Sequence, residues 1–223
     1  MFTSFLRTQE LEILDHEGLS LRGRRMLADL DVWNRRTGWY GAHVRRIRRH
    51  WVALGRPTPF RVLDVGTGFG GLLSALSESE LPCVLTGVDL AQGFVDDAAG
   101  RLAGRARVVL GDATALPFAD GAFDLVTNTL LMHHLGPADR VRFVHECARV
   151  ARSAYIFDLE VTLYGVLGFP IVATALGMGR DAIHDGVLSV RRGSTLAEME
   201  ALCAPLPVRV TRVFPSGICT LPA

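Results

Sequence analysis

The chain has 223 residues, of which 49% are hydrophobic and 21% charged, a composition typical of globular rather than disordered proteins. Its formal net charge of +1 provides no global attraction for nucleic acid or for an anionic membrane. All of its basic residues are arginine, so no lysine is available for Schiff-base chemistry.

The cysteines and the N-terminal sequence indicate a reducing compartment. Cys83, Cys147, Cys203 and Cys219 lack the spacing of a metal site, and we expect buried free thiols. The N-terminal sequence MFTSFLRTQELEILDHE lacks the apolar core of a signal peptide. We therefore expect a cytoplasmic protein.

Residues 1–55 predict an N-terminal helical arm or cap, because leucines recur there at loosely helical spacing. The run RRIRR at 45–49 is interpreted as a solvated helix face, with a site for an anionic group as the alternative. His16, His43 and His50 fall in the same arm, where we expect them to be solvated. A glycine and two prolines at 55–59 mark the boundary of the next unit.

Residues 56–223 predict an α/β domain with a doubly wound, mostly parallel seven-stranded sheet of the Rossmann-like type. Short apolar runs alternate with helix-length amphipathic stretches, which is typical of a parallel sheet covered on both faces. Ligands of such sheets bind at the carboxyl ends of the strands. After a helix that begins with a capping box at Thr195–Glu198, two strands are expected to form a hairpin across 215–217. The expected strands before them are FRVLDVG, VLTGVDL, RVVLGDA, FDLVTNTLL and AYIFDLE, with helices near 70–80, 92–103 and 137–150.

Residues 161–179 form a stretch of 19 residues without a charged side chain. This length is close to that of a membrane span. A mid-segment proline and four glycines, together with the position before the last strands, favour a helical lid insertion at about 161–183. Tyr164, Phe169, Ile171 and Met178 are expected to line an apolar pocket under this lid. Core packing, a dimer contact and peripheral membrane contact are the alternatives.

A glycine-rich loop follows the first predicted strand, in the sequence Asp64-Val-Gly-Thr-Gly-Phe-Gly-Gly71. Glycines at these positions allow a tight turn and let a ligand approach the backbone. The loop satisfies both G-x-G-x-G and the dinucleotide pattern G-x-G-x-x-G. Asp89 ends the second strand, where its carboxylate can accept both ribose hydroxyls of an adenosine cofactor.

Several segments in a fixed order then distinguish between the cofactors. They resemble class I S-adenosylmethionine-dependent methyltransferases, specifically the small-molecule group found in secondary-metabolite pathways, closely over residues 60–150 and loosely elsewhere. The segments that carry the resemblance are LDVGTGFG, Asp89, GDATALPF, FDLV and LLMHHL.

The resemblance implies S-adenosylmethionine as cofactor. It implies that Asp64 lies near the methionine amino group, that Leu90 flanks the adenine and that Asp112 holds the adenine N6. The implied cofactor-binding residues are Asp64, Gly66, Thr67, Gly68, Asp89, Leu90, Asp112, Ala113 and Asn128.

The acceptor is expected to be small and apolar, with O-methylation of a phenolic or polyketide-like metabolite as the preferred reaction. His133 and His134 follow the fourth strand and are the candidate bases, since imidazole has a suitable pKa for removing a proton; a structural role is the alternative. Tyr40, Tyr164, Phe169 and His184 are the candidate substrate contacts. No metal is expected, because strand-end carboxylates such as Asp158 and Glu160 more often cap loops or contact substrate.

Other functions remain open at this point. A nicotinamide-dependent oxidoreductase fits the glycine loop, but the chain has no Tyr-x-x-x-Lys pair. A nucleic-acid methyltransferase is disfavoured, because TNTLLM stands where that class has an N/D-P-P-Y/F tetrapeptide. A further alternative is a catalytically silent cofactor-binding protein. For a methyltransferase, N- or C-methylation is the alternative to O-methylation. The protein is expected to be a monomer or a homodimer.

Overall fold

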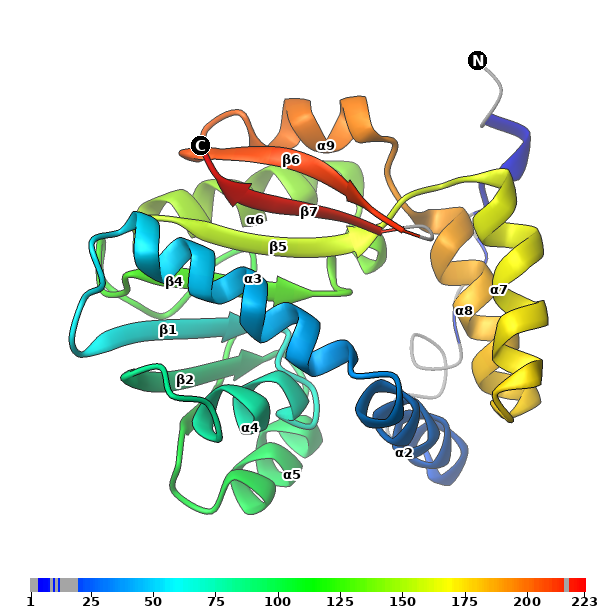
Figure 1. Ribbon diagram of the computed structural model, residues 1–223, viewed down its shortest axis with the longest axis horizontal. Helices are drawn as coiled ribbons and strands as arrows, with labels where there is room; N and C mark the ends of the chain where they lie inside the picture. Colours follow the sequence, from blue (N-terminus) through cyan, green and yellow to red (C-terminus); the bar gives the residue numbers. More distant parts are fainter. Residues whose placement is uncertain (1–3, 9, 11, 13–19, 215–216) are drawn as a thin grey trace.

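A seven-stranded sheet forms the centre of the computed structural model, which describes residues 4–8, 10, 12, 20–214 and 217–223 (Figure 1). The strand order is β3-β2-β1-β4-β5-β7-β6, and only the pairings of β7 are antiparallel. The predicted doubly wound, mostly parallel sheet is therefore confirmed. The strands are β1 Phe60–Val65, β2 Cys83–Asp89, β3 Arg107–Leu110, β4 Leu125–Thr129, β5 Ala154–Leu159, β6 Val208–Val213 and β7 Gly217–Pro222.

The chain reverses its direction of travel across the sheet between β1 and β4. From β1 it winds outward through β2 to β3, and then returns to pair β4 with the other side of β1. Ligands of open α/β sheets bind in the crevice beyond the carboxyl ends of the strands at this switch point. The fold therefore places the glycine loop after β1 and the His133–His134 pair after β4 at the same edge.

Two apolar cores hold helices against the two faces of the sheet. One core includes Ile47 of α3, with α4 and α5, and the other includes Phe143 of α6 and Met199 of α9. α9 has the predicted capping box of Thr195 and Glu198. These helices are α3 Trp39–Ala53, α4 Gly71–Ser77, α5 Gln92–Leu102, α6 Pro137–Val150 and α9 Leu196–Cys203.

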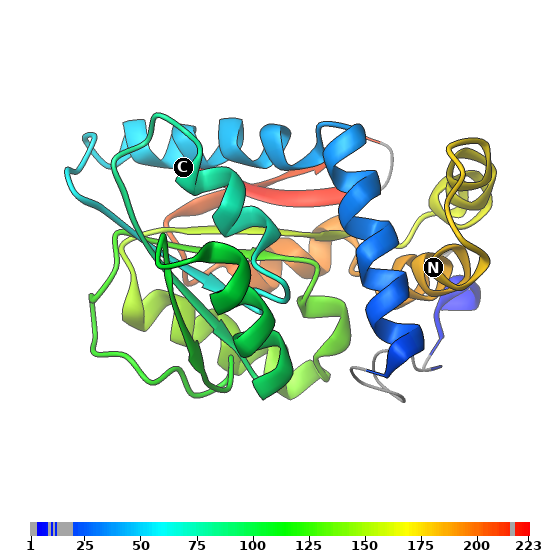
Figure 2. The same ribbon diagram turned by 90° about the horizontal axis from the view of Figure 1, so that it is seen from below.

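A third group of helices lies beyond the carboxyl edge of the sheet (Figures 1 and 2). It consists of α2 Leu21–Arg36, α7 Leu163–Ala175 and α8 Arg180–Arg192, which share a small apolar cluster around Met26, Ala173 and Met178. Among the described residues, no helix has the length and apolar character needed to cross a membrane. The assignment of 1–55 to an arm, of 56–223 to a domain and of 161–183 to a lid remains a prediction.

Two histidines of the N-terminal region differ from the expectation of solvent exposure. His43 and His50 are buried, because α3 lies flat over the sheet rather than apart from it (Figure 1). His43 contacts the Tyr155 hydroxyl, and His50 lies 3.0 Å from the Ser153 hydroxyl oxygen. Burial lowers the pKa of His43 to about 3 and that of His50 to about 4. His16 and the predicted turn at 215–216 lie outside the described residues.

The four cysteines are free thiols, as predicted from their spacing. Cys147, Cys203 and Cys219 are buried and Cys83 is partly buried. Burial raises the pKa of each of these thiols, which makes them inert at neutral pH.

Gly71 and Gly100 provide a test of how the N-terminal helices dock. A Cβ added at Gly71 would lie 2.1 Å from the Tyr40 hydroxyl oxygen, which donates a hydrogen bond to Asp31, whereas a Cβ at Gly100 would meet nothing within 4 Å. We expect Gly71→Ala to lower the free energy of unfolding by about 1–3 kcal/mol through overpacking. Gly100→Ala should raise it by up to about 1 kcal/mol, because alanine favours a helix. Urea denaturation measures both, and equal effects of the two substitutions would contradict the packing described here.

Candidate functional site

The glycine loop after β1 has a backbone that only glycine adopts without strain. Gly66, Gly68 and Gly70 have φ angles of +68°, +50° and +71°. The amides of Gly66 and Thr67 both donate to the carbonyl oxygen of Val88, which ties the loop to β2. A Cβ added at Gly68 would meet no atom of the described residues within 4 Å, so this part of the loop presents open backbone at the carboxyl edge.

Asp89 connects the end of β2 to this loop. Its carboxylate accepts hydrogen bonds from the Gly68 amide at 2.9 Å and from the Ala91 amide at 3.1 Å. Burial raises the pKa of Asp89, while the hydrogen bonds from Ala91, Gly68 and Leu90 lower it and limit the rise. Asp89 therefore shapes the loop and also offers its carboxylate to a ligand lying beside it.

Asp64 is a buried carboxylate beneath the loop. It accepts hydrogen bonds from the hydroxyls of Thr67 at 2.9 Å and Thr127 at 2.8 Å. Neighbouring Asn128 on β4 donates its amide to the Val65 carbonyl oxygen at 2.8 Å. The side-chain oxygen of Asn128 is buried and has no hydrogen-bond partner among the described residues. Such an acceptor usually has a partner, so this position suits an N–H donor from a ligand.

The other predicted cofactor residues lie at the ends of β2 and β3. Leu90 follows β2 with 73% of its surface exposed. Asp112 is exposed after β3 and accepts hydrogen bonds from the amide and hydroxyl of Thr114 at 2.7 and 2.8 Å, with partly exposed Ala113 between them. All nine predicted cofactor residues therefore lie at or next to the carboxyl edge of β1–β4.

His133 and His134 form a short helical turn, η2 Met132–His134, directly after β4. His133 is buried, and its Nδ1 lies 2.7 Å from a carboxylate oxygen of Asp158 on β5. The backbone amide of His133 donates to the other oxygen of Asp158 at 3.2 Å. Burial raises the pKa of Asp158, but the charge and hydrogen bond of His133 outweigh it, so this pKa lies below its usual range. Asp158 thus fixes the ring of His133.

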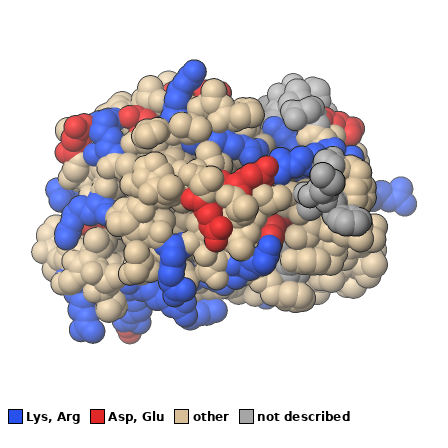
Figure 3. Space-filling view, turned by 90° about the horizontal axis from the view of Figure 1, so that it is seen from above, with Lys and Arg blue, Asp and Glu red and all other residues tan. Residues whose placement is uncertain are grey.

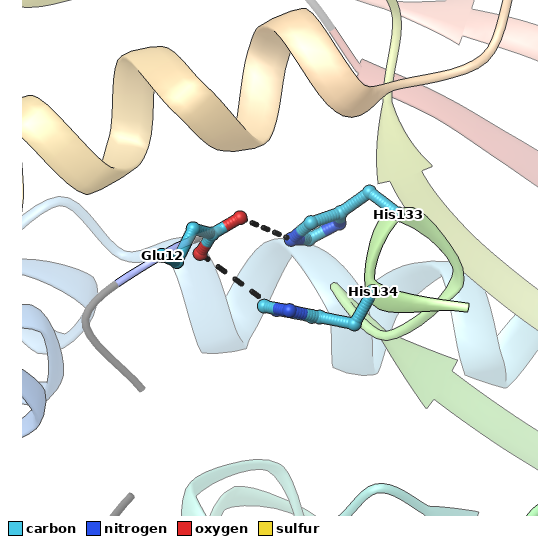
Figure 4. Close-up of side chains that lie close together, drawn as sticks. All are labelled: Glu12, His133 and His134. Atoms are coloured by element: carbon cyan, nitrogen blue, oxygen red, sulfur yellow. Dashed lines mark ion pairs between the residues drawn. The ribbon is translucent and has the colours of Figure 1, made fainter. Parts of the chain in front are cut away.

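Glu12 from the N-terminal segment lies opposite this pair (Figure 4). Its two carboxylate oxygens lie 3.6 Å from His133 Nε2 and 3.8 Å from His134 Nε2. Arg192 of α8 approaches the same carboxylate to within 3.6 Å. Sequence reasoning missed Glu12, because nothing in the spacing of the sequence connects it to residues 121 positions away.

The donor atoms of Glu12, His133 and His134 lie within 4.8 Å of one another, as the ligands of a metal ion do. The Arg192 side chain is only 11% exposed and already supplies positive charge beside Glu12. A divalent cation next to a buried guanidinium would meet strong repulsion. The charges of the cluster therefore favour acid–base chemistry over metal binding.

The four predicted substrate contacts are spread over the molecule. Tyr40 is partly buried behind the glycine loop, where it donates a hydrogen bond to Asp31 at 2.7 Å. Phe169 packs against Gly186, in the contact between α7 and α8. Tyr164 and His184 are exposed on those same two helices. Phe169 thus has an internal position, whereas Tyr164 and His184 face solvent.

Comparisons with known proteins agree with the fold. A family model described as a methyltransferase domain matches residues 62–154. Malonyl-[acyl-carrier protein] O-methyltransferase of Geobacter sulfurreducens is 41% identical over 85 residues, covering 37% of this chain and 32% of the relative. Demethylmenaquinone methyltransferase of Roseiflexus castenholzii is 37% identical over 144 residues, covering 59% of this chain and 60% of the relative. The chain thus spans less than two thirds of the length of these relatives.

A solved structure shows the same architecture. An O-methyltransferase from neocarzinostatin biosynthesis, in complex with S-adenosyl-L-homocysteine and 1,4-dihydroxy-2-naphthoic acid, superposes with a TM-score of 0.52 at 26% identity. The match covers 78% of this chain and 51% of that one.

These findings and the sheet indicate what kind of domain the chain contains. The antiparallel β7 between β5 and β6 departs from the order 3-2-1-4-5-6 of dinucleotide-binding folds. Residues 62–154 match a methyltransferase domain, and the fold and the relatives of the chain are those of S-adenosylmethionine-dependent methyltransferases.

Asp64 gives the site a measurable pH dependence. Burial raises its pKa to about 6, despite the hydrogen bonds from Thr127 and Thr67. Between about pH 4 and pH 6, the folded protein therefore keeps a proton on Asp64 that the unfolded chain has already released. Stability contributed by this group falls as pH rises through that window, by up to about 1.4 kcal/mol per pH unit. We expect Asp64→Asn to remove this contribution, so that urea denaturation shows the variant gaining stability relative to wild type as pH rises; parallel pH profiles would contradict the assignment.

Proposed function

We propose that this chain methylates a hydroxyl group of a small, apolar acceptor, such as a phenolic or polyketide-like metabolite. The observation that carries the proposal is the His133–Asp158 pair at the carboxyl edge of the sheet, next to the glycine loop. A histidine fixed by a buried carboxylate is the arrangement that makes imidazole an effective base.

The residues at the carboxyl edge fit the cofactor. Bound S-adenosylmethionine supplies an electrophilic methyl group on a sulfonium. Open backbone at Gly68 accommodates a ligand without steric conflict, and the carboxylate of Asp89 is suited to the ribose hydroxyls. The buried oxygen of Asn128, which has no hydrogen-bond partner in the described part of the chain, and the carboxylate of Asp64 are suited to the cationic amino group. Asp112 and Leu90 are assigned to the adenine.

His133 is assigned the proton of the acceptor. With a proton on Nδ1 donated to Asp158, the lone pair of Nε2 is directed away from Asp158 and can accept the hydroxyl proton. Nε2 lies 3.6 Å from Glu12, which is longer than a hydrogen bond, and the His133 side chain is 3% exposed, so the acceptor hydroxyl is required to enter beside Glu12 to reach this nitrogen. His133 would take up this proton while the acceptor oxygen receives the methyl group that bound S-adenosylmethionine would supply, with the neutral thioether as the leaving group.

Glu12 and His134 are assigned the role of positioning His133 and the proton that it receives. The Glu12 carboxylate faces both rings and stabilises the positive charge that His133 acquires, while Arg192 orients that carboxylate. The burial of Glu12 and His133 excludes water from the reacting hydroxyl.

Several observations favour an apolar acceptor. Aromatic and aliphatic side chains of α2, α7 and α8, including Trp33 and Phe169, form an apolar cluster beyond the carboxyl edge. The neocarzinostatin-pathway enzyme was crystallised with a dihydroxynaphthoic acid, which is an aromatic hydroxyl compound. The Roseiflexus relative is named for demethylmenaquinone, and the Geobacter relative for a malonyl group on acyl-carrier protein. An aromatic hydroxyl acceptor agrees with the ligand of the neocarzinostatin-pathway enzyme and with the assignment of His133 as the base.

Calorimetric titration with S-adenosylmethionine, S-adenosylhomocysteine and NADH tests the cofactor assignment. We expect the two sulfur nucleosides to bind and NADH not to bind. Asp89→Ala should weaken binding by about ten-fold or more, because hydrogen bonds to a charged group contribute about 1.5–3 kcal/mol. Asp89→Asn should weaken it less, since one oxygen remains for the Gly68 amide. Asp139→Ala, at a partly exposed position of α6, is the control, and an equal loss in both alanine variants would refute the placement of the ribose.

Turnover with radiolabelled cofactor and a panel of phenols tests the base. We expect His133→Ala to lower kcat by about 100-fold or more, with unchanged cofactor affinity, because positioned bases contribute about that factor. His145→Ala, at an exposed position of α6, should leave kcat unchanged. Full turnover by His133→Ala would exclude the base assignment. Loss of wild-type activity in a chelator, restored by zinc, would instead identify Glu12 and the histidines as metal ligands.

A further inference from the structure

α7 has an amino-acid composition that does not match its position. It is a helix of 13 residues, LYGVLGFPIVATA, with no charged side chain, and it is apolar around its whole circumference. Helices of this kind are normally buried on all sides. Here only Gly165 and Ala173 are buried. Large apolar side chains of α7 and its C-terminal cap are 52–71% exposed, namely Leu163, Tyr164, Leu167, Ile171, Val172 and Leu176.

Arginines lie at both ends of this apolar surface. Near its first turn, Arg212 on β6 is paired with Glu160, and the Arg212 side chain is 60% exposed. Beyond its last turn, Arg180 begins α8 and shares a depression of about 470 Å³ with Arg22 and Arg25 of α2. Two aspartates also line this depression, and Arg22 is paired with one of them, Asp181, at 2.8 Å, so the positive charge there comes from Arg25 and Arg180. The view in Figure 3 shows uncharged surface at the α7 end of the molecule.

The position of α7 relates this surface to the candidate active site. α7 packs on α8, which in turn contacts η2, the turn that carries His133 and His134. α8 also supplies Arg192, which approaches Glu12. The apolar face of α7 is therefore separated from the acceptor site by one helix and lies on the carboxyl side of the sheet (Figure 2).

We propose that α7 docks this protein onto the surface of an anionic lipid bilayer. The apolar side chains of α7 insert among the acyl chains near the headgroups, and the arginines at its ends contact lipid phosphates. Docking in this orientation turns the acceptor site toward the bilayer, so the acceptor class is a lipid-soluble hydroxyl compound that enters from the membrane. This statement about the acceptor rests on the proposed function, whereas the docking itself does not.

Two features favour a lipid surface over a second copy of the chain. A single short helix with half-exposed side chains offers a few hundred Å² of apolar area, less than the roughly 800 Å² per partner of a stable protein interface. Arginines at the margins of the patch complement anionic headgroups, whereas two copies related by a two-fold axis would bring like charges together. At 13 residues, α7 is too short to span the bilayer and is suited to lie at its surface.

Vesicle co-sedimentation tests the docking. We expect wild type to bind phosphatidylglycerol–phosphatidylcholine vesicles, to bind pure phosphatidylcholine vesicles more weakly, and to lose part of its affinity in high salt. Leu167→Glu/Ile171→Glu places two charges on one face of α7 and should lower the vesicle partition coefficient at least ten-fold. The control is Val52→Glu/Val141→Glu, which makes the same charge change at exposed apolar positions of α3 and α6 and should bind like wild type.

A second pair of variants separates the electrostatic contribution from damage to α7. Arg25→Gln/Arg180→Gln should lower binding to the anionic vesicles and leave binding to neutral vesicles unchanged. Absence of wild-type binding to both kinds of vesicle would overturn the proposal. So would sedimentation of wild type as a dimer that Leu167→Glu/Ile171→Glu dissociates, since a second copy would then cover α7.

Cofactor titration of the same variants keeps this test apart from the proposed function. We expect Leu167→Glu/Ile171→Glu to bind S-adenosylmethionine as wild type does, because α7 lies outside the glycine loop and the strand ends. Vesicle binding without any methyl transfer would leave docking standing and remove the acceptor assignment. Methyl transfer without vesicle binding would overturn the docking and leave the proposed methylation of a hydroxyl acceptor standing.

Discussion

The reversal of strand order between β1 and β4 is the constraint on which the rest of the structure depends. Because the chain winds outward from β1 and then returns to its other side, the loops after β1 and β4 diverge and leave a crevice. Asp89 fixes the loop on one side of this crevice through the Gly68 amide, and Asp158 fixes His133 on the other. Two strand-end carboxylates thus hold the two halves of the site.

Burial gives the carboxylates of this site different properties. Among the described residues, Asp64 receives hydrogen bonds from the neutral hydroxyls of Thr67 and Thr127, and burial raises its pKa to about 6. Asp158 is equally buried, but the adjacent imidazole of His133 brings its pKa below the usual range. The difference arises from the partner rather than from the depth of burial. A carboxylate that lacks a positive partner is suited to receive one from a ligand, whereas Asp158 already has its partner and serves to orient it.

The helices beyond the carboxyl edge are less integrated than the sheet. α2, α7 and α8 share a cluster with few fully buried residues, while the cores on the two faces of the sheet are extensive. Regions with few buried apolar contacts open at lower free energy than the cores. α2, α7 and α8 are therefore expected to open at lower free energy than the sheet.

The sequence by itself determined the doubly wound sheet, the glycine loop and the carboxylate at the end of β2, because strand and turn patterns depend on residues close together in the chain. It also identified the His133–His134 pair. Only the tertiary structure decided that Asp158 holds His133, that Glu12 faces both rings, and that His43 and His50 are buried. These features join residues 25 to 122 positions apart or depend on which face of α3 meets the sheet. Local periodicity carries no information on such contacts, since they arise when separate elements pack.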